Sequence, residues 1–200
     1  MDREKAKELA DQSRRAFDFI QKLYHESSYM VREIEAALAD EEEKFVICRP
    51  SGYAISSLNS RGLEPQNVNW WLLRRFLVCF VPEDKTQMAG GTTRTEFKDD
   101  LKVLCFRIVM DDKDTPPMVL AGVLYDIHNK NSSWQKFEHL IVHIEYRAPK
   151  VFVDPKKIEY DDAYAKFRGK LLRKELFTIN SSEDLQKKII SPALELYRSV

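Results

Sequence analysis

The chain has 200 residues, 44% of them hydrophobic and 11% aromatic, which is enough apolar material for one large folded domain and excludes a disordered chain. Its 32 basic and 32 acidic residues leave a net charge of zero, which argues against a protein whose main task is gripping nucleic acid. The longest unbroken apolar run, residues 76–81, is far too short to span a membrane.

The cysteines indicate a reducing compartment. Cys48, Cys79 and Cys105 each lie within an apolar run, and no pair has the spacing of metal ligands. An odd number of scattered thiols is not typical of a disulfide framework. The first residues are charged and lack the apolar core of a signal peptide. We therefore expect a cytoplasmic protein with no membrane attachment, whose thiols are reduced and inaccessible.

The first 43 residues predict a helical segment. Between residues 2 and 40, one apolar line from Leu9 to Ala37 steps by three and four, and a second from Ala10 to Leu38 repeats every seven. Together they form a stripe broader than a two-position coiled-coil seam. A continuous helix of this length would span ~60 Å, longer than a globule with a radius of gyration of about 16–17 Å. The segment therefore either breaks at Ser27-Ser28 or projects and packs against another chain.

From residue 44 to residue 147 the apolar pattern changes to a period of two, which predicts a sheet. Short polar links between successive strands favour an antiparallel arrangement of five or six strands. The loop at 82–100, which contains Gly90-Gly91, is long enough to suggest a functional or disordered segment. The expected strands lie at 45–49, 53–58, 70–81, 101–110, 118–127 and 139–147.

Residues 148–200 predict two helices. The first has an apolar face of Tyr160, Tyr164, Phe167 and Leu171, and the second opens with Ser181 and Asp184 in the spacing of a capping box. Pro192 is expected to kink or divide the second helix. The whole chain is thus expected to form a single α+β domain, in which helices from both ends cover one face of the sheet.

The strongest candidate binding site lies at Arg74 and Arg75, which interrupt the most hydrophobic strand. A guanidinium fork can hold the carboxylate or phosphate of a small anionic ligand, and the indoles of Trp70 and Trp71 can stack on it. Neighbouring residues of a strand point to opposite faces. At least one of the two arginines is therefore expected to pair with an acidic neighbour instead.

Two further patterns have simpler interpretations. His139, His143 and Glu145 fall on one face of a predicted strand, but the two histidines would then lie ~13 Å apart, too far to share a metal ion. A solvated sheet face is favoured, and no metal or cofactor is expected. The basic run from Lys166 to Lys174 could contact nucleic acid or an acidic partner, although a solvated helix face is the simpler interpretation.

No nucleophile elbow or phosphate-binding loop occurs in the sequence, and the cysteines lie in apolar strands that disfavour the thiolate. The favoured class is a non-enzymatic binding or interaction module that forms homo-oligomers through residues 2–40. An enzyme with its site at the sheet and the 82–100 loop, acting on a small anionic substrate, is the alternative. A nucleic-acid-associated factor that uses the basic carboxy-terminal helix is the third.

Overall fold

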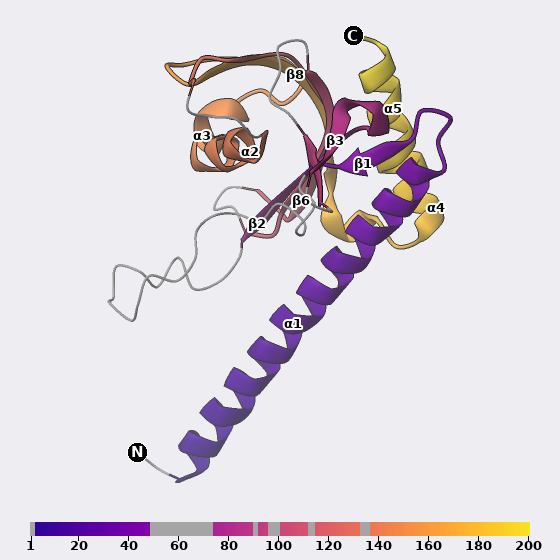
Figure 1. Ribbon diagram of the computed structural model, residues 1–200. Helices are drawn as coiled ribbons and strands as arrows, with labels where there is room; N and C mark the ends of the chain where they lie inside the picture. The colour runs from indigo at the N-terminus through magenta and orange to yellow at the C-terminus, as the bar shows by residue number, and fades with distance from the viewer. Residues whose placement is uncertain (1–2, 49–73, 90–91, 96–100, 112–114, 133–136) are drawn as a thin grey trace.

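The computed structural model describes residues 3–48, 74–89, 92–95, 101–111, 115–132 and 137–200. Within these residues, a six-stranded sheet has the order β1-β2-β5-β6-β8-β7, and all neighbouring strands are antiparallel. Helices cover both of its faces (Figure 1). The predicted α+β class is confirmed, with an antiparallel sheet and with the helices from both ends of the chain on one of its faces.

The central strands β2, β5 and β6 carry almost continuous apolar sequence because both faces of the sheet are buried there. Cys79 of β2 lies opposite Cys105 of β5, which lies opposite Gly122 of β6, and Gly122 lies opposite Leu171 of β8. The strands are β1 (Phe45–Ile47), β2 (Arg75–Pro82), β5 (Leu101–Val109), β6 (Met118–Asn129), β7 (Ile158–Asp161) and β8 (Ala165–Glu175).

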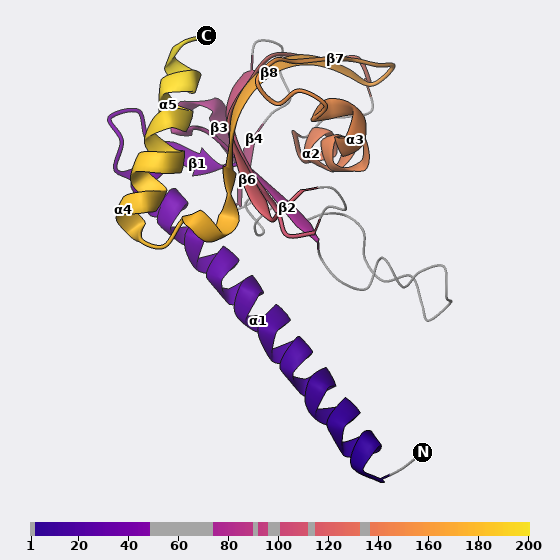
Figure 2. The same ribbon diagram turned by 180° about the vertical axis from the view of Figure 1, so that it is seen from behind.

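One face of the sheet packs against α1 and the carboxy-terminal helices, and the other packs against α2 and α3 (Figure 2). On the first face, Phe80 and Phe106 meet Ile34 and Leu38 of α1. On the second, the central strands meet Leu140 and Ile144 of α2, among others. The helices are α1 (Arg3–Ala39), α2 (Phe137–Tyr146), α3 (Ala148–Val151), α4 (Ser182–Leu185), a π-helical stretch (Gln186–Ile190) and α5 (Ser191–Arg198), with 3-10 turns at Glu83–Lys85 and Leu176–Thr178.

Helix α1 is continuous over 37 residues, a length of about 55 Å at 1.5 Å per residue. Only its carboxy-terminal part is buried, through Ser27, Val31, Ile34 and Leu38. The rest projects away from the domain (Figure 1). The Ser27 hydroxyl does not break the helix, because it donates to the carbonyl of Leu23 at 2.9 Å within the same helix. Of the two alternatives for this segment, the projecting helix is the one observed.

The strand predicted at residues 139–147 is wrong, since these residues lie mostly in helix α2. Phe137, Leu140, Ile141 and Ile144 recur at helical spacing and are all buried against the sheet. The segment is short and rich in β-branched residues, so its alternating pairs resembled a strand.

The helix predicted at residues 160–174 is also wrong. Tyr160 lies on β7, and the basic run lies on β8, where Phe167 and Leu171 are buried and Lys166 and Arg168 are exposed. A spacing of four residues fits a strand as well as a helix, because it is a multiple of two. The predicted basic helix face therefore does not exist.

The predictions for the 82–100 segment, the second carboxy-terminal helix and the strand at 53–58 have different outcomes. The expected loop at 82–100 contains part of a hairpin, with β3 (Thr86–Ala89) paired to β4 (Thr92–Thr95). The second carboxy-terminal helix is confirmed, because the Ser181 hydroxyl accepts the N–H of Asp184 at 3.1 Å. Pro192 does not divide this helix, because helical backbone continues from Ser182 to Arg198 and changes from π-helical to α-helical just before the proline. The strand expected at 53–58 lies outside the described residues.

Candidate functional site

The arginines singled out from the sequence both have acidic partners. Arg74 Nη1 lies 2.8 Å from Asp111 Oδ2 at the surface. Arg75 Nε lies 3.3 Å from Glu145 Oε2, and its side chain is half-buried. Trp70 and Trp71 lie outside the described residues, so their proposed stacking role has no structural account. The binding of an anionic ligand at this position stays a prediction.

The partner of Arg75 belongs to a buried ionic cluster that the sequence did not reveal. Glu145 is only 3% exposed, and its Oε1 accepts a hydrogen bond from Arg107 Nε at 2.7 Å. The Arg107 guanidinium also lies 4.6 Å from the ring centroid of Phe152. Two guanidiniums therefore compensate one buried carboxylate. The available signal was Arg107 itself, the one charge in the apolar run 103–110 of the sequence, because a buried charge needs an acidic partner.

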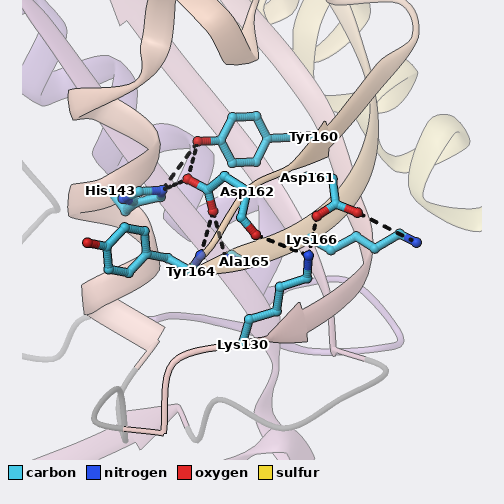
Figure 3. A network of polar contacts seen from close by, with 8 residues as sticks. All are labelled: Lys130, His143, Tyr160, Asp161, Asp162, Tyr164, Ala165 and Lys166. Carbon is cyan, nitrogen blue, oxygen red and sulfur yellow. Dashed lines mark hydrogen bonds and ion pairs between the residues drawn. The ribbon is translucent and has the colours of Figure 1, made fainter.

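A second polar network lies at the amino-terminal end of β8 and connects it to α2 (Figure 3). His143 Nε2 lies 2.7 Å from Asp162 Oδ2. The Tyr160 hydroxyl donates to the same oxygen at 2.7 Å. The other oxygen, Oδ1, accepts the backbone N–H groups of Tyr164 and Ala165 at 2.8 and 2.9 Å. All the groups around this carboxylate act as donors toward it.

These contacts shift the pKa values of two groups. Burial alone raises the pKa of the Asp162 carboxyl, but hydrogen bonds from Tyr160, Ala165, Tyr164 and His143 together hold it well below its ordinary value. Burial and the hydrogen bond to Asp162 raise the pKa of Tyr160 well above the usual value for a phenol. The carboxylate and the neutral phenol are therefore the stable forms over the physiological range.

The residue types of this network are those of an acid–base site, but its hydrogen bonds join α2 to the β7–β8 turn and so have a structural role. Both oxygens of Asp162 already accept two contacts each, so the carboxylate is occupied by the fold itself. His139 and His143 lie one turn apart on α2, which corrects the strand spacing expected from the sequence. Among the described residues, no group of three or more His, Cys, Asp and Glu side chains could hold a metal ion.

The cysteines are buried, as expected, in the apolar core. A hydrogen bond with Cys105 and burial are the main causes that raise the pKa of the Cys79 thiol. A nucleophilic thiolate is therefore disfavoured at Cys79. The slow reaction of all three thiols with reagents stays a prediction.

The most unusual surface lies on the projecting part of α1, residues 3–22. None of these residues is buried, and Leu9, Phe17 and Phe19 are 46%, 65% and 62% exposed. Leu9 and Ile20 continue the apolar line that Ser27, Val31, Ile34 and Leu38 bury against the sheet. Because the line extends well beyond the domain, about half of this helix has an apolar face that no other described element covers.

A groove of about 500 Å³ lies beside this surface, between α1 and the segment from Leu176 to Leu185. Its apolar lining includes Leu23 and Met30, and the aromatic side chains of Tyr29 and Phe177 are largely exposed beside it. Glu26 and Glu33 also line the groove, and no lysine or arginine is among the described residues that do so. The groove is therefore both apolar and acidic.

None of the helices in the described part of the chain is long and apolar enough to cross a membrane. The chain matches no protein-family model, no curated protein and no solved structure. Its function therefore has to be argued from the surfaces described above.

Proposed function

We propose that this protein is a non-enzymatic interaction module that forms homo-oligomers through helix α1. The observation that carries the proposal is the apolar line of α1, which is buried at Ile34 and Leu38 and continues uncovered to Leu9. An isolated helical stretch of about 20 residues is only marginally stable in water. Packing against another chain would bury its apolar side chains and stabilise its backbone.

Two carboxylates with partners inside the fold support the choice of a binding module over an enzyme, and the net charge supports it over a nucleic-acid-associated factor. The carboxylate of the His143 network is fully hydrogen-bonded within the fold, and the Glu145 cluster is closed by two arginines. The net charge of zero permits close approach of identical copies and argues against general nucleic-acid binding. A cytoplasmic location is part of the proposal, and the three free, buried cysteines are typical of a reducing compartment.

The test is the solution mass of the protein over a dilution series. We expect a multiple of 23.5 kDa at micromolar concentration and dissociation on dilution. Phe17→Glu should lower the oligomer population at least tenfold, because it places a charge on the apolar surface. Val153→Glu makes a matched change at an exposed apolar side chain that follows α3, away from α1, and it should leave the mass unchanged. A parent protein of 23.5 kDa at all concentrations would refute the proposal.

A further inference from the structure

We infer that the groove between α1 and the Leu176–Leu185 segment receives the projecting part of α1 from a second copy of this chain. This inference rests on the proposed self-association and adds the partner's segment and the place where it binds. Two copies would then form a reciprocal dimer, in which each gives its projecting helix and each offers its groove.

The position of the groove along α1 favours this pairing. The projecting part ends at residue 22, and the groove begins at Leu23 on the same helix. When two α1 helices lie antiparallel, the projecting part of each therefore runs beside the groove of the other. The projecting part spans about 30 Å at 1.5 Å per residue, which is longer than the stretch from Leu23 to Glu33 that lines the groove. One helix can thus cover the whole groove.

The side chains on the two surfaces are chemically matched. The projecting helix exposes Phe17 and Phe19, and the groove is bordered by Tyr29 and Phe177, each 59% exposed. Aromatic pairs of this kind contribute beyond the area they bury. The same association would cover apolar side chains from both surfaces, which otherwise remain in contact with water.

The charges point to the same partner. Residues 3–22 contain six basic and four acidic residues, a net charge of +2. Residues 23–43 contain one basic and seven acidic residues, a net charge of −6 with histidine neutral. An antiparallel pair sets the basic half of one helix beside the acidic half of the other, whereas a parallel pair sets like against like. Within the acidic half, Glu26 and Glu33 are the carboxylates that line the groove itself.

The opposite charges permit a complementation experiment with two variants. The groove variant, Glu26→Lys with Glu33→Lys, makes the groove basic. The helix variant, Arg14→Glu with Arg15→Glu, makes the projecting part acidic, at the cost of only an exposed contact between Arg14 and Asp11. Within the groove, the first variant alone sets two lysines against the basic part of its partner, and the second sets an acidic part against Glu26 and Glu33. Mixed in equal amounts, the two variants restore opposite charges in both contacts.

We expect each variant alone to have the mass of one chain at a concentration where the parent is a dimer, and the mixture to regain the dimer mass. Glu159→Lys, on the exposed edge strand β7, is the charge control and should dimerise like the parent. Phe177→Ala removes an exposed ring from the groove without disturbing the core, and it should raise the dissociation constant at least tenfold.

The outcomes separate this inference from the proposed function. A parent that never self-associates refutes the proposed function. If the parent, the groove variant and Phe177→Ala all dimerise equally well, the protein self-associates, but the groove is not the binding site. Loss of dimer in both charge variants without recovery in the mixture also overturns the pairing. Circular dichroism of each variant, matched to the parent, establishes that the loss is not unfolding.

Discussion

The two faces of the sheet are covered in different ways. On the α2 face, the buried residues include three ionisable side chains, Arg107, His143 and Glu145, which make ion pairs or hydrogen bonds with sheet residues or with Asp162. On the α1 face, Ser27 is the one buried polar residue in the described part of the chain, and its hydroxyl is satisfied within α1. Buried polar contacts therefore fix α2 on the sheet, whereas α1 is held mainly by apolar packing, with an exposed hydrogen bond from Ser182 to Glu33 at its edge.

This difference bears on function because apolar packing is not directional. Helix α2 is held on two sides, by Glu145 near β2 and β5 and by His143 near the amino-terminal end of β8. Among the residues that the structure describes, none anchors the projecting part of α1 in this way, and the apolar line continues along it with exposed side chains. The α2 face thus closes the domain, whereas the helix on the α1 face continues beyond the sheet with an exposed apolar line.

The first prediction removes one ion pair from the α2 face of the sheet. Arg107→Met leaves Glu145 with Arg75 as its remaining ionic partner, and we expect the free energy of unfolding to fall by about 3–5 kcal/mol, because a buried charge loses its better partner. Replacing both groups, Arg107→Met with Glu145→Met, should recover most of that loss. Chemical denaturation at neutral pH measures both values. A loss below about 1 kcal/mol for the single variant would show that the cluster is solvated.

The second prediction compares the two halves of α1. Ile34→Ala should lower the free energy of unfolding by about 2–5 kcal/mol, because it leaves a cavity against the sheet. Leu9→Ala lies on the same apolar line but on the projecting part, and in dilute protein its effect should stay within about 0.5 kcal/mol. Equal losses in the two variants would contradict the division of α1 into a packed half and a projecting half.

The third prediction concerns the pH dependence of the Asp162 network. Its carboxyl pKa is lower in the folded protein than in the unfolded chain, where it is about 3.9. The stability that it contributes is therefore present above about pH 4 and is lost as the pH falls below that value. We expect Asp162→Asn to be less stable than the parent at pH 7, and this difference to shrink below about pH 4. Acidic groups other than Asp162 cancel in the comparison, and a difference independent of pH would contradict it.

The sequence predicted an element correctly where its apolar pattern fits only a helix or only a strand, and failed where the pattern fits both. The strands at 101–110 and 118–127 and the cap at Ser181 were predictable, because long apolar runs and a capping residue each have one interpretation. The segment around His143 was predicted as a strand and is a helix, and the segment around Phe167 was predicted as a helix and is a strand. Both errors arise because apolar residues four apart fit either element. Their true states depend on packing against the sheet, which is not local information.

The candidate site was predictable in part for the same reason. The apolar stripe of residues 2–40 is visible in the sequence, and the projecting α1 confirms one of its two expected forms. The groove beside it was not predictable, because its two walls are about 150 residues apart in the chain. The partner of Arg75 was missed because Glu145 was expected on the solvated face of a strand and not on a helix that packs against the sheet.

The last prediction compares the stability effects of replacing Arg74 and Arg75, which are the smallest effects expected here. Arg74 forms an exposed ion pair with Asp111, so Arg74→Lys should change the free energy of unfolding by less than about 1 kcal/mol. Arg75→Lys should cost more than Arg74→Lys, because lysine keeps the charge near buried Glu145 but loses the guanidinium geometry. Thermal melts of the parent and both variants, with and without a panel of phosphates and carboxylates, test the binding of an anion at the same time. If either arginine anchors such a ligand, a panel member raises the melting temperature of the parent and raises that of the matching lysine variant less, because the bidentate fork is lost. If no panel member raises the melting temperature of the parent, the two arginines serve only their acidic neighbours, and the polar face has a purely structural role.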